Sequence, residues 1–337
     1  MIDFTVAIPT YNGADRLPDV LERLRSQLHL DSFEWEVIVV DNNSTDSTEN
    51  VVKKYQKEWI NNCKLYYYFE PEQGAAFARQ KAVDLAKSGL IGFLDDDNLP
   101  TSNWVISAYQ FAQAHPKVGA FGSEIQGDFA IPPANSLSAL YHFLGIIERG
   151  NLPSYYSPKE RILPPAAGLV IRKEAWQNAV PKRLFLNHKG KEAGLASEDL
   201  EAVLYIQKAG WELWHNPDMK IFHKIPATRL EKEYLLSLCR CIGLSRHHLR
   251  MIRLKPWQCL IATPIYWLND VFKLLKHIIF FSKQVKKDVI FACDRQLLIS
   301  SVLSPFFLAK IYWQEQVHLL KSNSLISFFK PPLKKHP

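Results

Sequence analysis

The sequence is poor in features that define several protein classes. It has five cysteines, which form no CxxC pair and have no histidine near them at the spacing of a zinc site. They are Cys63, Cys239, Cys241, Cys259 and Cys293, and we expect them to be the reduced thiols of a cytosolic protein. Residues 1–25 carry charges throughout and contain no apolar core region, so we predict no secretory signal peptide.

Beyond residue 230, long charge-free runs are also absent. The longest there are 256–269 and 296–309, each of 14 residues and each containing proline. Because a helix that crosses a bilayer needs about 20 apolar residues, we predict no transmembrane helix. Helices that are buried or lie at a membrane surface suit these lengths better.

The composition is that of a globular protein with unevenly placed charge. With 47% hydrophobic and 22% charged residues, the 337-residue chain has room for one large domain with an appendage, or for two domains. Residues 230–337 hold 17 Lys and Arg against 6 Asp and Glu, and residues 1–229 hold the remaining 24 against 28. This asymmetry predicts a catalytic body followed by a region that contacts something anionic.

Two periodicities alternate in the front part of the chain. Short apolar runs rich in β-branched and aromatic residues predict buried strands at 4–9, 36–40, 64–69, 90–94 and 118–123. Helical spacing of apolar residues covers 17–28, 47–59 and 75–89. Strands that alternate with helices predict an α/β fold with a mainly parallel, doubly wound sheet flanked by helices.

The stretch LIGFLDDDN, residues 90–98, sets three aspartates directly after an apolar run. In a doubly wound sheet, ligands bind beyond the carboxyl ends of the strands, which is where Asp95, Asp96 and Asp97 are expected. Adjacent carboxylates repel one another, and Mg²⁺ with phosphate oxygens is a simple compensation. A solvated acidic turn is the alternative, since Asp and Asn are common turn residues.

Two neighbouring strands of the predicted sheet also end in polar residues. Asp41, Asn42 and Asn43 follow the strand at 36–40, and residues 9–12 end the first strand. We therefore expect one polar rim along three strand ends. Taken alone, Asp41 is equally well explained as a residue that prepares a helix cap.

A second acidic site comes later in the chain. Glu198 and Asp199 open a helical pattern after a loop that contains glycine. An acidic pair in the first turn is common because it favours the helix dipole. As a functional group, a carboxylate here would accept the proton of an attacking alcohol.

Six segments together resemble the family 2 glycosyltransferases of the GT-A fold, in order and in spacing, over about residues 3–225. They are VAIPTYNGADRL, VIVVDNNSTDST, EQGAAFARQKAV, FLDDDN, AAGLVIRKEAW and SEDLEAVLYIQKAGWEL. More narrowly, the chain resembles cyanobacterial glycosyltransferases of hormogonium polysaccharide biosynthesis. The resemblance implies an inverting enzyme that moves a sugar from a nucleotide-sugar, by default a UDP-sugar, to a lipid-linked or polysaccharide acceptor, with Mg²⁺ or Mn²⁺.

The resemblance also implies roles for individual residues. The donor-binding positions are Pro9, Thr10, Tyr11, Asn12, Asp41, Gly74, Arg79, Asp95, Asp96 and Glu198. Asp97, Asp95 and His223 are the implied metal ligands, although a lone histidine at a strand end is often structural. Gly168 would let backbone approach the acceptor, unless it is a simple strand-edge glycine. Asp199 is the implied catalytic base.

The chain departs from the family pattern at two points. The family often has glycine just before the Glu-Asp pair, where this chain has Ser197, which puts the acceptor contacts of that loop in doubt. The QxxRW-type motif of processive polysaccharide synthases is absent. We therefore expect one sugar to be added per encounter.

We divide the chain into a GT-A catalytic domain at 1–228, a basic amphipathic helical region at 229–330 and a basic tail at 331–337. The catalytic domain would consist of a nucleotide-sugar-binding half, 1–127, and an acceptor-binding half, 128–228. In the helical region, Thr263 and Pro264 are expected to cap and open a helix.

Apolar faces, aromatic residues and surplus Lys and Arg over 256–313 predict helices that lie on the anionic cytoplasmic face of a membrane. The protein would then be cytoplasmic and peripherally bound. The alternative for this region is a helical subdomain packed on the body or a dimer contact. We predict no nucleic-acid partner, because the aromatic residues fall at amphipathic-helix spacing and no nucleic-acid motif accompanies them.

Two other functions are alternatives to a glycosyltransferase. A nucleotidyltransferase also sets carboxylates at strand ends, but it would favour a glycine-rich basic loop after the first strand, and PTYNGADRL has one glycine and no lysine. A module that binds sugar-nucleotide or membrane without catalysis would not need both Asp97 and Asp199.

Overall fold

The computed structural model describes residues 2–30, 33–59, 63–160, 162–187, 195 and 197–328, with side chains as far as residue 314. The predicted basic tail at 331–337 lies outside the described residues. The strands are β1 Phe4–Thr10, β2 Trp35–Asp41, β3 Cys63–Phe69, β4 Leu90–Phe93, β5 Asn98–Pro100, β6 Val118–Phe129, β7 Ser154–Tyr155, β8 Val170–Arg172 and β9 Glu212–Ile225.

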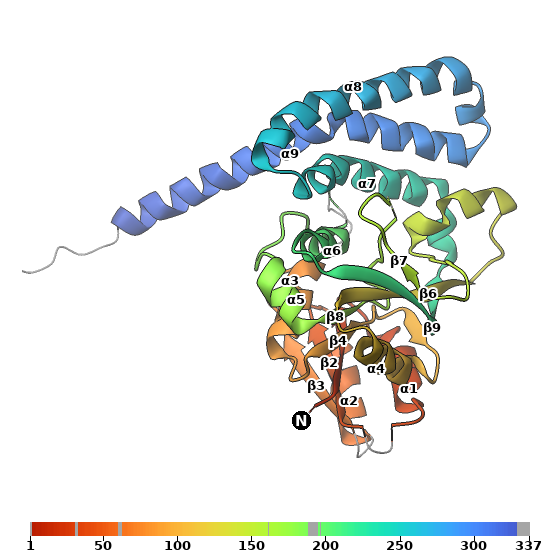
Figure 1. Ribbon diagram of the computed structural model, residues 1–337, viewed down its shortest axis with the longest axis vertical. Coiled ribbons are helices and arrows are strands. Elements are labelled where there is room, and N and C mark those ends of the chain that lie inside the picture. The colour runs from red at the N-terminus through yellow and green to blue at the C-terminus, as the bar shows by residue number, and fades with distance from the viewer. Residues whose placement is uncertain are drawn as a thin grey trace, which may run out of the picture.

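The α-helices are α1 Leu17–Arg25, α2 Thr48–Lys57, α3 Ala75–Leu85, α4 Trp104–Ala114, α5 Lys173–Ala179, α6 Glu198–Lys208, α7 Lys232–Ile252, α8 Pro256–Phe281 and α9 Val289–Phe328. The described residues also contain the 3₁₀ segments η1 Asn135–Leu144, η3 Ala227–Leu230 and η4 Gln284–Lys286. Figure 1 shows a sheet flanked by short helices, with the three longest helices beyond one end of it.

All described strands join one sheet, in the order β3-β2-β1-β4-β8-β6-β9-β5, and β7 pairs with β9. The first four strands are parallel. Beyond them β8 runs antiparallel to both β4 and β6, and β6 runs parallel to β9. The predicted α/β fold is confirmed, and its parallel pairing is concentrated in the front half of the sheet.

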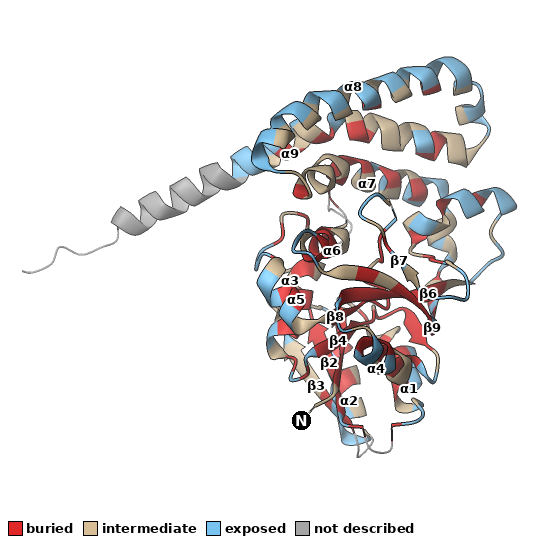
Figure 2. Cartoon of the chain, in the orientation of Figure 1, coloured by how far each residue is buried: buried red, intermediate tan, exposed pale blue. Residues whose placement is uncertain are grey.

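Both faces of the central strands are buried, as their mainly apolar runs predicted. Every residue of β1 and β2 is buried, and alternate side chains enter two different cores because strand residues point to opposite faces. Phe4 and Val6 pack on the side of α1 and α4, whereas Ala7 and Ile38 pack on the side of α3, α5 and α6. Figure 2 shows this buried centre between more exposed helices.

This packing sets the polar strand ends side by side. Thr10 is the last residue of β1 and is the register partner of Asp41, the last residue of β2. On the other side of β1, Ala7 is the partner of Phe93, which ends β4 just before the aspartates. Three polar strand ends therefore meet at one edge of the sheet.

Three long helices follow the sheet. In Figure 1, α7 lies beside α6 and the body, and α8 and α9 form a hairpin that continues away from the sheet. Arg250 of α7 is bound to the buried Asp270 of α8, with Nη1–Oδ2 and Nη2–Oδ1 distances of 2.5 and 3.0 Å. The basic region thus forms a layer tied to the body through α7.

The start predicted for the helix around residue 264 is wrong. The helix α8 begins at Pro256, so its first turn does contain a proline, but Thr263 and Pro264 both lie inside the helix. Pro305 lies inside α9 in the same way. Proline lacks the backbone N–H that a helix interior uses as a donor, and it therefore favours the first turn. Two prolines of α8 fit that rule from the sequence, and the prediction chose Pro264 where the helix begins at Pro256.

Within the described residues, one stretch of helix, Val289–Gln314 of α9, is long and apolar enough to cross a membrane. The sequence analysis missed it because charged residues interrupt the apolar runs. Length and composition do not separate a spanning helix from one that packs on protein, and 28% of the apolar 18-residue window within this stretch is buried in the structure.

Candidate active site

One cavity of about 1120 Å³ opens at the polar edge of the sheet. Most of the residues predicted for the site line it: Pro9, Thr10, Tyr11, Arg79, Asp95, Asp96, Asp97, Glu198, Asp199 and His223. They come from the ends of β1 and β4, from α3, from the start of α6 and from β9. The structure therefore places the aspartate run and the second acidic site in the same cleft.

Asp41 and Asn12 support this cleft from behind and do not line it. Asp41 is 3% exposed and accepts hydrogen bonds from the Ser44 amide at 2.9 Å and from the Tyr67 hydroxyl at 2.8 Å. The side-chain oxygen of Asn12 accepts a hydrogen bond from the Thr45 amide at 2.8 Å. Both residues hold the loop after β2 in position.

Gly74 and Gly168 also lie outside the cavity lining, and both have backbone conformations that favour glycine. Gly74 has φ +145°, and its amide donates to the Asn42 side chain at 2.6 Å. Gly168 has φ +66°, and a Cβ there would stand 2.4 Å from Ser123 Oγ. The carbonyl of Gly168 accepts a hydrogen bond from that hydroxyl at 2.7 Å. This contact holds the segment that leads into β8 against Ser123 of β6.

Arg79 joins the two acidic sites. Its guanidinium lies 2.6 Å from Glu198 Oε1 and 3.1 Å from Asp95 Oδ1. The arginine and Glu198 are buried. Burial raises the pKa of Asp95, and the charge of Arg79 opposes that rise. An arginine from α3 thus fixes the aspartate run relative to the start of α6.

Asp96 is held by two side chains from the end of β1 and the start of α1. It accepts a hydrogen bond from the Thr10 hydroxyl at 2.6 Å, and Arg16 donates to it through Nε at 2.7 Å and Nη2 at 2.9 Å. This bidentate contact raises the pKa of Arg16. The sequence analysis missed Arg16, because nothing local to it signals a partner 80 residues away.

Asp97 faces the other end of the cavity. Arg229 Nη2 lies 2.8 Å from Asp97 Oδ2, and Arg229 Nη1 donates to His223 Nε2 at 2.8 Å. His223 Nε2 and Asp97 Oδ2 are 3.5 Å apart. Burial alone would raise the pKa of Asp97, but His223 and the charge of Arg229 hold it at about 2. The carboxylate is therefore ionised, with the Arg229 guanidinium in contact with two of the three predicted metal ligands, Asp97 and His223.

The donor set at this point fits a hard divalent cation in part. A carboxylate oxygen and an imidazole nitrogen that share one ion, each about 2.1 Å from it and at a right angle, lie about 3.0 Å apart. The 3.5 Å between Asp97 and His223 is close to this. No three His, Cys, Asp or Glu side chains among the described residues form a complete site, so phosphate oxygens and water would supply the remaining ligands.

Asp199 lies in the first turn of α6. Its Oδ2 accepts a hydrogen bond from the Ala166 amide at 2.9 Å, and its Oδ1 accepts one from the Leu200 amide at 2.8 Å. Burial and the adjacent charge of Glu198 raise its pKa to about 6, against the lowering effect of Arg79. This carboxylate is ionised at neutral pH and is a stronger base than an ordinary aspartate.

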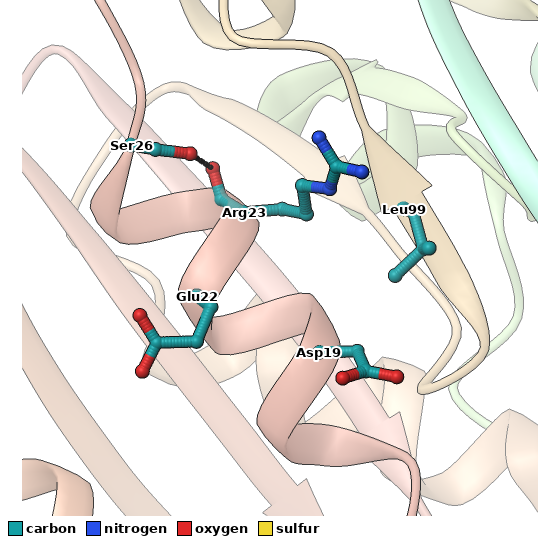
Figure 3. Close-up of a pocket in the computed structure, with 5 residues that line it drawn as sticks. All are labelled: Asp19, Glu22, Arg23, Ser26 and Leu99. Carbon is teal, nitrogen blue, oxygen red and sulfur yellow. Dashed lines mark hydrogen bonds between the residues drawn. The ribbon is translucent and has the colours of Figure 1, made fainter.

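The long helices complete the cavity, which sequence reasoning did not anticipate. Its lining includes Arg246 and Arg250 from α7, Tyr266 and Lys273 from α8, and Leu297 from α9. A second hollow, of about 410 Å³, lies between α1 and Leu99 (Figure 3) and contains none of the predicted site residues. The cavity at the aspartates is therefore the candidate active site.

A family comparison supports this assignment. Residues 5–164 match the model of the family described as "Glycosyl transferase family 2". A curated relative, the "Putative teichuronic acid biosynthesis glycosyltransferase TuaG" of Bacillus subtilis, is 36% identical over 94 residues, which are 28% of this chain and 35% of that protein. The chain thus spans about a third of the length of the curated relatives that it matches first.

Solved structures match more of the chain and show the fold. The mannosyltransferase PcManGT of Pyrobaculum calidifontis, solved with GDP-Man and Mn²⁺, has a TM-score of 0.57 and 16% identity, covering 90% of this chain and 86% of that one. The 1–349 fragment of S. aureus TarS, solved with UDP-GlcNAc, has a TM-score of 0.51 and 18% identity, covering 75% and 70%. The predicted GT-A fold is thereby confirmed.

Proposed function

Because residues 5–164 match the model of glycosyl transferase family 2, we propose that the protein is an inverting, metal-dependent glycosyltransferase. Its donor would be a nucleotide-sugar, with a UDP-sugar as the default. Its acceptor would be a lipid-linked or polysaccharide hydroxyl in the synthesis of an exopolysaccharide or another cell-surface glycan. One observation carries the proposal: Asp97 and Asp199 line the same cavity. Their relative position is held by Arg79, which forms ion pairs with Asp95 of the aspartate run and with Glu198, the neighbour of Asp199.

The donor half of the cavity is formed by the ends of β1 and β4. Pro9, Thr10 and Tyr11 would contact the nucleoside, with Asp41 supporting them through the loop after β2. Asp97 and His223 would hold Mg²⁺ or Mn²⁺, which when bound neutralises the charge that develops on the departing nucleoside diphosphate. Asp95 is turned toward Arg79 in this structure, and its predicted metal contact stays a prediction.

The chemistry at the acceptor side rests on Asp199. The acceptor oxygen attacks the anomeric carbon and forms the new C–O bond, while the bond from that carbon to the diphosphate oxygen breaks. The electron pair leaves with the diphosphate, and the hydroxyl proton passes to the Asp199 carboxylate. Attack opposite the leaving group inverts the anomeric configuration. A pKa of about 6 suits this role at neutral pH.

A screen of nucleotide-sugars, with and without Mn²⁺, tests this proposal by thermal shift and by release of nucleoside diphosphate. We expect one donor to raise the melting temperature only when metal is present, because ligand that binds the folded state stabilises it. Asp97→Asn should abolish the metal-dependent shift. A donor that stabilises the protein equally in chelator would contradict the metal-bridged site.

The same screen separates the alternatives. A nucleotidyltransferase would release inorganic pyrophosphate from a nucleoside triphosphate, whereas a glycosyltransferase releases a nucleoside diphosphate. A binding module without catalysis would show the thermal shift and no product with any acceptor. Peripheral contact of α8 and α9 with the cytoplasmic face of a membrane is part of the proposed function, because it would bring the cavity to membrane-bound acceptors.

A further inference from the structure

The cavity has a cationic wall that the donor site does not use. On the side of α7 and α8, its lining includes Arg246, Arg250, Arg253 and Lys273. Every acidic residue of the described lining comes from the body, and none comes from α7 or α8. One cleft therefore joins the carboxylates of the body to a wall of guanidinium and ammonium groups from α7 and α8 that carries no carboxylate.

Lys273 is the cation of this wall that has neither a hydrogen-bond partner nor an ion-pair partner among the described residues. Arg250 is paired with the buried Asp270, and Arg253 donates to the carbonyl of Pro158 at 2.6 Å and to Gln207. Among the described residues, no hydrogen bond or ion pair involves the ammonium of Lys273. Its charge faces the cavity uncompensated, which favours an anionic ligand at this end.

The geometry of α8 joins this wall to an apolar surface. Tyr266, Asn269 and Lys273 line the cavity and are spaced three and four residues apart, so they share one side of the helix. The rest of α8 is largely exposed (Figure 2), and much of that exposed surface is apolar. Its large side chains and their exposed fractions are Trp257 60%, Leu260 78%, Ile265 58%, Leu268 60%, Phe272 67% and Ile279 73%.

This exposed side of α8 carries no carboxylate. An apolar face of this size is unusual on a protein that stays in water, and together with the surplus of Lys and Arg it suits the surface of an anionic bilayer. A ligand bound at Lys273 therefore lies beside a surface that suits acyl or isoprenoid chains.

We infer that the acceptor is a lipid phosphate: a long apolar alcohol joined through phosphate or diphosphate to the sugar that receives the transfer. The inference rests on the proposed function and names its acceptor class. The phosphate binds at Lys273, with Arg246 and Arg253 nearby, and the chain leaves across Leu268 and Phe272 toward the bilayer. The acceptor hydroxyl then points along the cavity toward Asp199. A neutral polysaccharide would use neither the unpaired cation nor the apolar face.

The test uses the full-length protein and farnesyl phosphate, a short isoprenoid phosphate, below its micelle-forming concentration. Binding is followed by tryptophan fluorescence in EDTA, which removes any metal-assisted binding of phosphate at Asp97. Two charge reversals are compared. Lys273→Glu alters the cavity wall, and Lys276→Glu makes the same change three residues further along α8, outside the cavity lining.

We expect Lys273→Glu to weaken farnesyl phosphate binding about tenfold, which is the order of one charge-assisted contact, and Lys276→Glu to change it less than twofold. Equal losses in both variants would overturn the inference in favour of adsorption to a basic surface. Binding of inorganic phosphate as tight as that of farnesyl phosphate would overturn it in favour of a free-phosphate site. Equal binding of farnesol would exclude a phosphate subsite.

A second measurement separates this inference from the proposed function. The donor- and Mn²⁺-dependent thermal shift is recorded on the same two variants. If that shift is retained while Lys273→Glu leaves farnesyl phosphate binding unchanged, the acceptor assignment fails and the transferase stands. If wild-type protein binds farnesyl phosphate but shows no metal-dependent shift with any nucleotide-sugar, the transferase proposal fails instead.

Discussion

At the scale of single residues, the candidate site is organised by three arginines, each bound to a different aspartate of one run. Arg79 contacts Asp95, Arg16 contacts Asp96 and Arg229 contacts Asp97. Because each carboxylate has its own cation, three adjacent negative charges are tolerated without strong mutual repulsion. Arg229 differs from the other two because it also contacts His223 and so binds two of the three predicted metal ligands.

Arg229 should therefore compete with a divalent cation. We expect Arg229→Met to tighten the binding of Mn²⁺ alone by roughly tenfold, since the variant frees one carboxylate oxygen and one imidazole nitrogen. Free Mn²⁺ can be followed by electron paramagnetic resonance with no nucleotide present. Arg16→Met, which frees Asp96, is the matched control and should leave Mn²⁺ affinity near the wild-type value. Weaker Mn²⁺ binding by Arg229→Met would show that the arginine orients the ligands and does not compete.

Asp199 can be tested as the base. Asp199→Asn should lower turnover by about 10²–10⁴-fold, the usual contribution of a positioned base, and should keep the metal-dependent thermal shift with donor. Wild-type turnover should be full above neutral pH and fall as the pH drops through about 6, because protonation removes the base. An acidic limb that persists unchanged in the residual activity of the variant would assign that titration to another group.

At the scale of elements, the turn into α6 holds an unusual conformation. Ser197, its N-cap residue, has φ +81° and makes no side-chain capping hydrogen bond. Left-handed backbone is costly for residues other than glycine. The chain therefore keeps a glycine-like backbone conformation where the family often has glycine. Serine replaces glycine at position 197, but the turn has the same conformation that glycine would adopt.

Ser197→Gly should stabilise the protein by about 0.5–1 kcal/mol. Ser47, the N-cap residue of α2, also lacks a side-chain capping bond but has φ −84°. Ser47→Gly is thus the matched control, and we expect it to give no gain, since glycine only adds unfolded-state entropy there. Chemical denaturation measures both variants. A loss of stability in Ser197→Gly would mean that the serine side chain stabilises the folded state by more than the free energy lost to its left-handed backbone conformation.

At the scale of the whole molecule, the acidic residues are concentrated in the body, and the surplus of basic residues and the exposed apolar side chains are concentrated in the long helices. The body carries the acidic cleft, and the region from 230 onward carries the surplus of Lys and Arg. The long helices extend the cavity on one side and present large exposed apolar side chains on another. This arrangement would let the cleft open beside a membrane while the donor arrives from water.

Flotation with liposomes measures the membrane contact. The protein should float with anionic liposomes at low salt and less well at high salt, because salt screens charges at the surface. Phe272→Glu should reduce flotation strongly, since it sets a carboxylate in the apolar face of α8. Leu152→Glu is the control, because Leu152 is also exposed, at 78%, but lies on the body. Equal effects of the two variants, or no flotation of wild type, would remove the membrane contact.

Much of the body could be predicted because its signals are local. The runs at 4–9, 36–40 and 90–94 are mainly apolar and form strands, and the polar residues that follow each run lie at the carboxyl ends of parallel strands. The rule that ligands bind at such ends placed Asp97 correctly in the cleft, and an acidic first turn placed Asp199 at the start of a helix. These inferences needed only residue order and periodicity.

The partners of those residues were decided by packing. Arg229 reaches Asp97 across 132 residues of chain, and Arg79 reaches Glu198 across 119. No periodicity encodes such contacts, because they depend on how β9, α3 and α6 are stacked around the sheet. The cationic wall of the cavity arose in the same way. A helical pattern identifies the apolar side of α8, but the position of Lys273 in the cleft follows only from the docking of that helix against α7 and the body.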